Sequence, residues 1–223
     1  MLYRIALALI LGVSLASPAS AQAGVFADAF GLSSVQTSTP PGSEPSLAPL
    51  GVAGTAFGVG ASLTVLFPSG WSIGGEWSVP ARITSTADVT YVTRYRIENR
   101  YYEPILSVLV RYRALRGSRA GIDVGGGASV AWQNTIQRRA DAIGTFPFFG
   151  GFGPFGPSTE YTSATLALTM AADLPITLST HLALVPAMRV HVVSRPSDSQ
   201  APLWYLGVDS WVYRPSVGVR VTF

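Results

Sequence analysis

The chain ends on VGVRVTF, Val217 to Phe223, in which an apolar side chain occupies every second position up to the last residue. Side chains of a β-strand alternate between two faces, so a strand here places Gly218, Arg220 and Thr222 on the face opposite to the apolar one. Chain ends usually fray and need not keep such a pattern. The regular apolar ending therefore indicates a terminal strand with one face against an apolar medium.

The same two-residue alternation runs through six further segments of the chain. The apolar register of all seven segments holds 41 residues, and each is aliphatic, aromatic, Met, Gly or Pro. The 34 positions between them carry eight charges and 21 small residues, Gly, Ala, Ser or Thr. A period of two predicts β-strands with one apolar face and one small, polar face. The seven predicted strands are 57–67, 71–79, 102–112, 122–132, 164–174, 182–192 and 213–223.

Two kinds of closed barrel separate apolar from polar side chains in this way. A soluble barrel of the lipocalin kind keeps its apolar face inside and turns a charged surface to water. Here charged residues make up only 12% of the chain, against about 25% in an average soluble domain. Backbone groups in lipid must all be paired within the protein, which a closed barrel with outward apolar side chains achieves. We therefore predict an all-β fold, an antiparallel up-and-down transmembrane β-barrel, with the soluble barrel as the alternative.

The charged residues of these segments all lie on the small, polar face, which such a barrel turns inward. Four acids and four arginines balance there, as a packed interior requires. Arg111 and Asp123 are equidistant from Gly117, which predicts a direct cross-strand pair. Asp173 would face His181 if its turn centres on residue 177, which predicts a buried ion pair. The predicted lumen charge network consists of Glu76, Glu103, Arg111, Asp123, Asp173, His181, Arg189, Arg214 and Arg220.

Aromatic residues bracket several of the predicted strands. Phe57 and Phe67 stand at the two ends of one 11-residue segment, and Tyr213 and Phe223 at the ends of another. Strands that cross a bilayer need about 9–11 residues and carry aromatic girdles at both interfaces. The predicted girdle residues are Phe57, Phe67, Trp71, Trp77, Tyr102, Tyr112, Trp132, Trp211, Tyr213 and Phe223.

The first 21 residues follow a different pattern, with Arg4 before an apolar run from Ile5 to Val13 and Ala19-Ser20-Ala21 after it. A positive n-region, an apolar h-region and a small-residue cleavage site are typical of a secretory signal peptide. The apolar run is shorter than the roughly 20 residues that cross a bilayer as a helix, which disfavours an uncleaved anchor. We predict a signal peptide at 1–21 and one barrel domain at 22–223.

The connections between the strands differ in length, and this predicts the orientation of the barrel. Short turns follow residues 67, 112 and 174, whereas long segments occupy 80–101, 133–163 and 193–212. Outer-membrane barrels place short turns in the periplasm and long loops outside the cell. An even number of strands then requires one more strand near 23–32, AGVFADAFGL, which makes the predicted total eight.

The signal segment, the strand rhythm and the final strand YRPSVGVRVTF resemble the small outer-membrane β-barrel superfamily of Gram-negative bacteria. This eight-stranded group includes the outer-membrane protein A and X barrels, and the resemblance covers nearly the whole mature chain. It implies a location in the bacterial outer membrane, contact with outer-membrane lipids and lipopolysaccharide, and a C-terminal strand that the barrel-assembly machinery reads. Pro104, Pro186 and Pro215 depart from the pattern, because a ladder hydrogen bond is expected at each position.

Two of the long segments combine aromatic or basic residues. TFPFFGGFGPFGP, at 145–157, places Phe residues on a chain rich in Gly and Pro, and TRYRIENRYYE, at 93–103, mixes Arg with Tyr. Exposed aromatic residues can bind partners. Alternatively, the Phe-rich segment folds onto the barrel rim while the arginines meet lipopolysaccharide phosphates. The predicted loop-interaction residues are Phe146, Phe148, Phe149, Phe152, Phe155, Arg94, Arg96 and Arg100.

Motifs for catalysis or metal binding are weak. Gly70-Trp71-Ser72-Ile73-Gly74 matches the G-x-S-x-G nucleophile pattern, but that motif needs a helix after the strand and none is expected here. His181 and His191 would lie about 33 Å apart on one strand and cannot share a metal ion. The chain has no cysteine, no lysine and no clustered basic stripe of the kind that binds nucleic acid. We expect no enzyme activity, no cofactor, no metal and no nucleic-acid partner.

The prediction is a monomeric barrel with a filled lumen and four extracellular loops, in a structural or surface-interaction role. Eight strands leave an interior only just wide enough for side chains, which argues against a continuous aqueous pore. Two alternatives stay open at this point. One is a conduit or binding site for small apolar solutes with the Phe-rich segment at its mouth. The other is a lipid A-modifying enzyme, since some outer-membrane barrels of this kind pair His with Ser.

Overall fold

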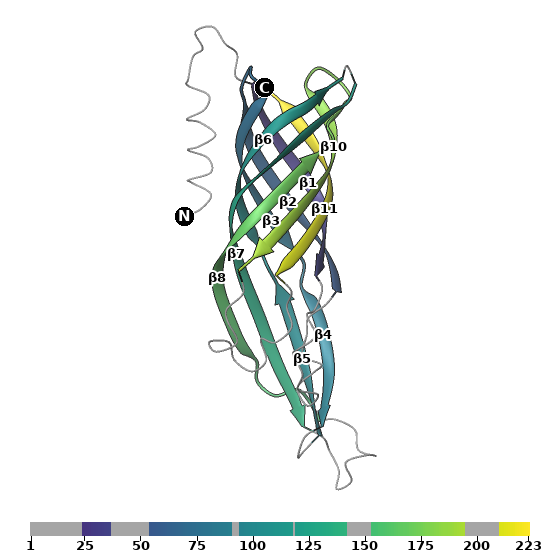
Figure 1. Cartoon of the computed structure of the whole chain (residues 1–223). Coiled ribbons are helices and arrows are strands. Elements are labelled where there is room, and N and C mark those ends of the chain that lie inside the picture. Colours follow the sequence, from purple (N-terminus) through teal and green to yellow (C-terminus); the bar gives the residue numbers. More distant parts are fainter. Residues whose placement is uncertain (1–23, 37–53, 91–93, 118, 142–152, 195–209) are drawn as a thin grey trace.

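The described part of the chain is built from β-strands (Figure 1). A computed structural model describes residues 24–36, 54–90, 94–117, 119–141, 153–194 and 210–223. Within these residues no helix is long and apolar enough to cross a membrane. The strands are β1 (Gly24–Gln36), β2 (Gly54–Leu66), β3 (Trp71–Pro80), β4 (Ile83–Thr90), β5 (Arg94–Tyr102), β6 (Ile105–Arg116), β7 (Gly121–Asp141), β8 (Thr159–Asp173), β9 (Ile176–Thr177), β10 (Leu182–Val193) and β11 (Trp211–Thr222).

Eight of these strands close into a barrel. The pairing runs in the order β1, β2, β3, β6, β7, β8, β10 and β11, and β11 pairs again with β1. Each of these pairings is antiparallel. The predicted eight-stranded antiparallel barrel is therefore confirmed. The additional first strand expected near 23–32 is β1, which continues to Gln36.

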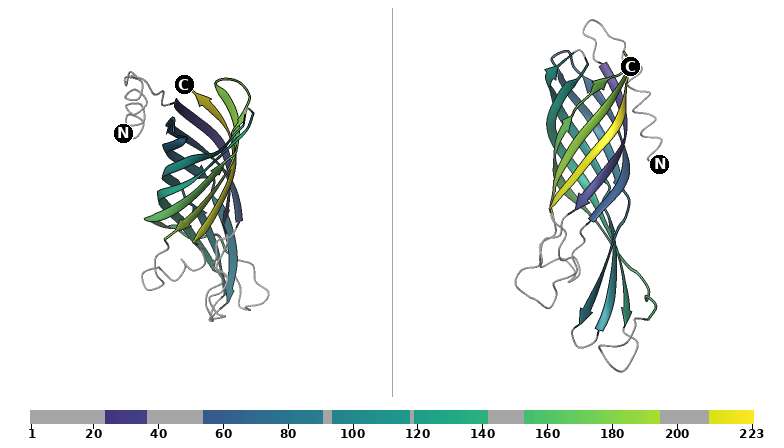
Figure 2. Two further views of the ribbon diagram at one scale, coloured as in Figure 1. Left: turned by 45° about the horizontal axis from the view of Figure 1, so that its top comes forward. Right: turned by 90° about the vertical axis from the view of Figure 1, so that its right-hand side faces the viewer.

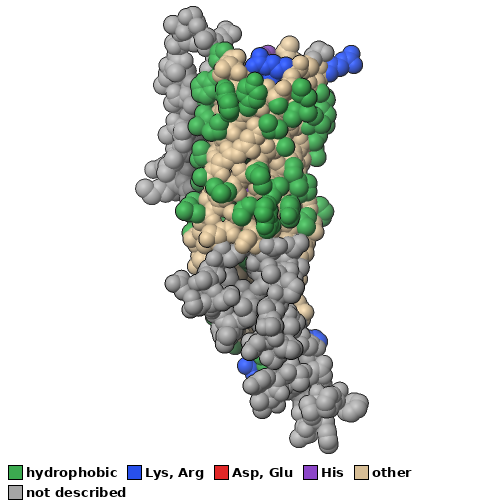
Figure 3. Space-filling model, viewed as in Figure 1, with side chains coloured by type: hydrophobic (Ala, Val, Ile, Leu, Met, Phe, Trp, Pro, Cys, Tyr) green, Lys and Arg blue, Asp and Glu red, His purple; other side chains and the backbone are tan. Residues whose placement is uncertain are grey.

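Side chains of the barrel strands alternate between the exterior and the lumen, as the period of two predicts. On β6, Val108 is 54% exposed, whereas the adjacent Ser107 is 2% exposed. Leu166 and Leu168 on β8 are also strongly exposed, and hydrophobic side chains are spread over the face of the barrel that Figure 3 shows. An apolar exterior around a polar lumen is the inverse of a soluble barrel, so the lipocalin-like alternative is wrong.

The two ends of the barrel differ. The connections from β2 to β3, from β6 to β7 and from β8 to β10 are short and lie at one end, where β1 begins and β11 ends; we call this the turn end. At the opposite end β7 and β8 continue beyond the barrel and join β4 and β5 in a four-stranded sheet, which we call the extension (Figure 2). The eight residues of β7 that pair with β5 carry the extension about 25 Å from the barrel.

The prediction of a long loop at 80–101 is wrong, because β4 and β5 form a hairpin within it. The hairpin carries polar or charged residues at positions of both parities, such as Thr84, Thr86, Arg96 and Asn99, so the alternation that marks a lipid-facing strand is missing. Strands β7 and β8 are likewise longer than predicted, since they continue to pair with each other beyond the apolar band, in the direction of the extension.

Three prolines lie where the ladders are interrupted, which resolves their departure from the strand pattern. Pro104 separates β5 from β6. The carbonyl of Pro186 accepts a hydrogen bond from Leu174 N–H (2.8 Å), at the break between β8 and β9. In an antiparallel ladder the N–H and C=O of one residue point to the same side, so the N–H that proline lacks would also face this break. Pro215 lies where the β1–β11 pairing omits Ser33 and Ser34. Each proline thus falls where a ladder donor is not used.

Placing Arg at an exterior position should destabilise the barrel according to depth. Val108→Arg, in the middle of β6, should lower the free energy of unfolding in lipid vesicles by about 2–4 kcal/mol. Leu115→Arg, on the same strand near the turn end and 59% exposed, is the matched control and should cost about 0–1 kcal/mol. Denaturant unfolding of both variants in the same vesicles measures the difference. Equal costs would mean that Val108 does not face hydrocarbon.

Candidate functional site

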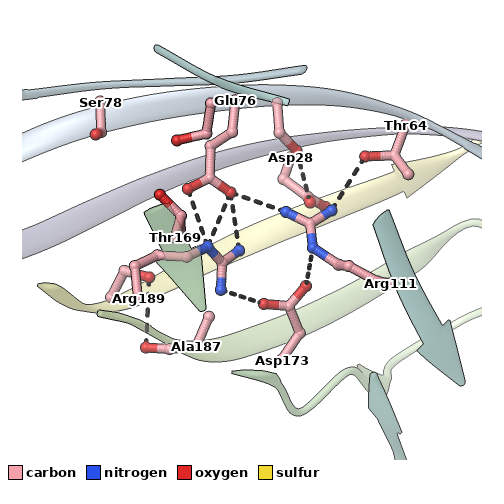
Figure 4. A network of polar contacts seen from close by, with 12 residues as sticks. Asp28, Thr64, Glu76, Ser78, Arg111, Thr169, Asp173, Ala187 and Arg189 are labelled. Carbon is pink, nitrogen blue, oxygen red and sulfur yellow. Dashed lines mark hydrogen bonds and ion pairs between the residues drawn. The ribbon is translucent and has the colours of Figure 1, made fainter. Parts of the chain in front are cut away.

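The centre of the lumen is occupied by two acids and two arginines from four strands (Figure 4). Glu76 on β3 accepts hydrogen bonds from Arg111 Nη2 (2.9 Å) and from Arg189 Nη2 (2.8 Å). Asp173 on β8 accepts from Arg189 Nη1 (2.5 Å) and lies 3.5 Å from Arg111 Nε. All four residues are buried. Each guanidinium therefore bridges both carboxylates, and the four side chains fill the middle of the barrel.

A second group of charges continues this network toward the turn end. Arg220 on β11 donates to Asp28 (2.7 Å) and Asp123 (3.2 Å) and lies 3.4 Å from Asp173. Arg113 on β6 forms an ion pair with Asp123 (2.8 Å). Asp28 also accepts from the hydroxyl of Ser62 on β2 (2.9 Å). The chain of ion pairs thus links β1, β3, β6, β7, β8, β10 and β11 through their side chains.

Sequence reasoning missed two members of this network, Asp28 and Arg113. Asp28 lies on β1, whose apolar alternation is weak because Ala and Gly occupy its outward positions at Ala27, Ala29 and Gly31. Arg113 lies one residue beyond the predicted end of its strand. Its even spacing from Arg111, which places both side chains on one face of β6, is the signal that could have identified it.

Two predicted pairings are wrong because the strand registers differ from those assumed. Asp123 faces Arg113 and Arg111 faces Gly125, because the β6–β7 ladder centres on residue 118 at these positions and not on Gly117. Asp173 faces Ala187, so the turn between β8 and β10 centres on residue 180 and not on 177. His181 consequently lies outside the lumen network: it is exposed at the turn end, and its Nδ1 is 3.1 Å from the carbonyl oxygen of Thr222.

Arg214 crosses the lumen farther from the turn end than the ion pairs of Glu76 and Asp173, and nearer the extension. Its guanidinium donates to the hydroxyl of Ser78 on β3 (2.5 Å) and to the carbonyl oxygen of Glu103. Both Arg214 and Glu103 are 1% exposed. With this pair included, five acids and five arginines share the described part of the lumen: Asp28, Glu76, Glu103, Asp123 and Asp173 with Arg111, Arg113, Arg189, Arg214 and Arg220.

A belt of hydroxyl groups lies in the lumen beside Arg214. Ser107 and Ser129 are 2.8 Å apart at their oxygens, Ser129 and Thr169 are 2.5 Å apart, and Thr169 Oγ1 lies 2.8 Å from His191 Nδ1. A hydroxyl next to an imidazole has the chemistry of a nucleophile and its base. Thr169 and His191 are, however, only 2% and 1% exposed, so a substrate cannot reach them without rearrangement of the barrel. The belt acts as packing between β6, β7, β8 and β10.

An apolar layer follows the hydroxyl belt in the direction of the extension. Each of its side chains is two positions beyond a lumen-facing polar residue on the same strand, and each is at most 5% exposed. The layer consists of Ile105, Ala131, Ala167, Val193 and Val212. The lumen therefore passes from ion pairs through hydroxyl groups to a closely packed apolar layer.

The predicted girdle residues lie in two bands on the exterior. Near the turn end the Trp71 and Tyr112 rings are 5.0 Å apart, and at the other boundary the Trp77 and Trp132 rings are 5.3 Å apart. The first band consists of Phe67, Trp71, Tyr112 and Phe223, and the second of Phe57, Trp77, Tyr102, Trp132, Trp211 and Tyr213.

The predicted loop-interaction residues are divided between strand and undescribed chain. Arg94, Arg96 and Arg100 belong to β5 and so lie in the extension, not in a loop. Arg100 forms an ion pair with Glu98 (2.8 Å). Phe155 is exposed, whereas Phe146, Phe148, Phe149 and Phe152 lie outside the described residues, as does the predicted signal peptide.

Two further arginines of the extension lie over tyrosine rings. The guanidinium of Arg139 is 4.4 Å from the centre of the Tyr95 ring, and that of Arg82 is 5.2 Å from the centre of the Tyr102 ring. Neither arginine was predicted, because both lie outside the segments with a regular alternation. Within the described residues, no group of three His, Cys, Asp or Glu side chains is placed to hold a metal ion.

No family model matches the chain, and no curated protein matches it. Solved structures similar to it include Ail, the attachment invasion locus protein of Yersinia pestis, with 13% identity, a TM-score of 0.49, and 91% of this chain and 99% of that chain covered. OprG from Pseudomonas aeruginosa is 16% identical with a TM-score of 0.45, covering 91% of this chain and 97% of that chain. Neisserial surface protein A is 12% identical with a TM-score of 0.40, covering 92% of this chain and all of that chain.

The closed ring, the apolar exterior and the two aromatic bands of this chain decide the assignment. Its fold is that of the small eight-stranded outer-membrane barrels. Barrels that turn an apolar band flanked by aromatic girdles to lipid, around a polar interior, belong to bacterial outer membranes, and this is the location of the protein.

Removing the charge of Glu76 should strongly destabilise the barrel, because Arg111 and Arg189 would lose a shared buried partner. Glu76→Gln should lower the free energy of unfolding by about 3–5 kcal/mol. Glu98→Gln removes the partner of the half-exposed Arg100 in the extension and should cost about 1 kcal/mol or less. Denaturant unfolding in vesicles compares the two, and similar losses would contradict a network that supports the barrel.

Proposed function

We propose that this protein is a closed outer-membrane anchor that holds an extended β-sheet outside the cell for contact with other molecules. The observation that carries the proposal is strand β7, which runs without interruption from Asp123 in the lumen network to Asp141 at the tip of the extension. In this proposal the turn end faces the periplasm and the extension faces outward. We also propose that the protein acts as a monomer, which a ring completed within one chain supports because no partner chain is needed to close it.

The packed lumen supports an anchor more than a conduit. Bridging ion pairs between Glu76, Asp173, Arg111 and Arg189 fill the centre, and the apolar layer around Ile105 lies between them and the extension. A solute would have to break both levels to pass. An enzyme that modifies lipid A would need a reactive group open to the membrane or to water, and the Thr169–His191 pair is buried in the lumen. We therefore propose a non-enzymatic role.

The side chains of the extension support a partner with negative charge. Residues 82–102, 134–141 and 159–166 contain six arginines and four acids. Tyr and Arg are also enriched at the residues that contribute most to protein interfaces. Arg139 stacks on Tyr95 and donates from Nε to Asp141 (2.8 Å), an arrangement that holds the guanidinium in place while its Nη groups can donate to a partner.

The arginines nearest the membrane support contact with lipopolysaccharide. Tyr102 belongs to the outer aromatic band, and Arg82 lies over its ring. Arg100 precedes Tyr102 by two residues on β5, which places it about 7 Å farther from the barrel. Guanidinium groups at this height would meet the phosphates of outer-membrane lipids.

Replacing the β4–β5 hairpin should abolish surface contact without disturbing the barrel. Residues 84–100 are exchanged for Asn-Gly, a two-residue turn that can join the paired positions Ile83 and Tyr101. Cells that display the unaltered protein should attach to dextran sulfate beads several times better than to neutral dextran beads, and the hairpin variant should lose this preference.

The controls separate loss of the hairpin from loss of the barrel. The variant should retain the shift in gel mobility on heating that marks a folded barrel, and neither form should give a steady porin-sized conductance in planar bilayers. Arg116→Gln, at the turn end, should leave attachment unchanged. Equal attachment of the unaltered protein and the hairpin variant would overturn the proposed role of the extension.

We also infer that Phe223 acts in assembly and not in packing, as the resemblance of the final strand to an assembly signal implies. Its side chain is 76% exposed, and Phe57 in the other aromatic band, at 77%, is a matched control. Phe223→Ala should lower the amount of folded barrel in the outer membrane, whereas Phe57→Ala should not. Both variants should refold in vesicles with stabilities within about 1 kcal/mol of each other. A normal level of Phe223→Ala barrel in cells would refute the inference.

A further inference from the structure

A cavity of about 340 Å³ opens at the turn end of the barrel. It lies between the β6–β7 turn, the β8–β10 turn and the end of β11, and Arg side chains are visible at this end in Figure 3. We call it the turn-end cup. Its polar lining includes Arg113, Arg116, Arg220, Ser179, Thr180 and Thr222.

Hydrogen bonds between the two turns hold the cup in shape. Gly121 N–H donates to the carbonyl of Pro175 (2.9 Å), and Thr177 N–H donates to the carbonyl of Arg119 (2.8 Å). Ala120 and Ile176 add an isolated β-bridge between the same turns. The walls are thus joined to each other as well as to the barrel, so the cavity is formed before any ligand arrives.

The charge of the cup is positive. None of the described residues that line it carries a side-chain carboxylate. Arg220 and Arg113 direct the nitrogen atoms that form ion pairs toward Asp28 and Asp123 in the lumen. Within the described part of the chain, Arg113 Nη1 donates no hydrogen bond. Because the acids and arginines of the described lumen balance one another, Arg116 adds a positive charge that this network does not neutralise.

We propose that the turn-end cup binds a small molecule bearing several carboxylate or phosphate groups. Guanidinium groups recognise such anions through charge-assisted hydrogen bonds, and the hydroxyls of Ser179, Thr180 and Thr222 can serve the remaining oxygens. The volume is at the lower end of the range for small-molecule sites, which fits a compact ligand. The ion pairs above the cup separate it from the rest of the lumen, so the ligand enters and leaves by the same opening.

This inference goes beyond the proposed surface role and requires only that the turn end be accessible to solution. The refolded barrel in detergent micelles is titrated with citrate and, separately, with inorganic phosphate, using calorimetry at constant ionic strength in chloride. Saturable binding of at least one probe is expected, and the two titrations distinguish carboxylate from phosphate as the preferred group.

Two matched Arg→Gln variants locate the site. Arg116→Gln should weaken binding about tenfold, the loss expected for one charged hydrogen bond. Arg119→Gln, an exposed arginine of the β6–β7 turn that does not line the cup, should leave binding unchanged, and both variants should keep the heat-dependent gel mobility of the folded barrel. Failure of both probes to saturate, or an equal loss in both variants, would overturn the proposal.

Discussion

Backbone hydrogen bonding within a bilayer is the constraint on which the rest of this structure depends. Lipid offers no partner to an N–H or C=O group, so the sheet must have no open edge at membrane depth. The β7–β8 and β1–β11 pairings complete the ring and meet this demand. Once the ring is closed, the alternation of side chains leaves each residue either in lipid or in a narrow lumen. Above the membrane the constraint no longer applies, and there the sheet opens into the extension.

Closure of a small ring in turn determines what the lumen can contain. Eight strands leave space for side chains and little else, so any charge inside must find its partner on an adjacent strand or directly across the narrow lumen. Glu76, placed between Arg111 and Arg189, illustrates the outcome, because each of its oxygens is used and each arginine is shared. The lumen is therefore part of what stabilises the barrel, and both of the proposed contact sites lie at its ends.

The sequence predicts the faces of the strands better than their registers. A lipid-facing position tolerates no charge, so the exterior of β6 could be read directly from Leu106, Val108 and Val110. The pairing of Arg111 could not, because it depends on where the β6–β7 ladder is centred, and moving the centre from residue 117 to 118 changes the partner while Arg111 still faces the lumen. The β4–β5 hairpin could not be predicted for a related reason. In water both of its faces can be polar, so the alternation of apolar and polar residues that marks a membrane strand is absent.

The unbroken length of β7 also has a mechanical meaning. Its ladder with β8 extends from Asp123↔Asp173 at the turn end to Gln137↔Thr159 in the extension without a change of register. A pull on the tip, directed away from the membrane, acts along the strand axes, so it loads many hydrogen bonds at the same moment. Rupture would then require the whole ladder to slide, whereas a force across the strands would open one bond after another. In the proposed role, the extension is thus held in the direction in which a bound partner outside the cell would pull on it.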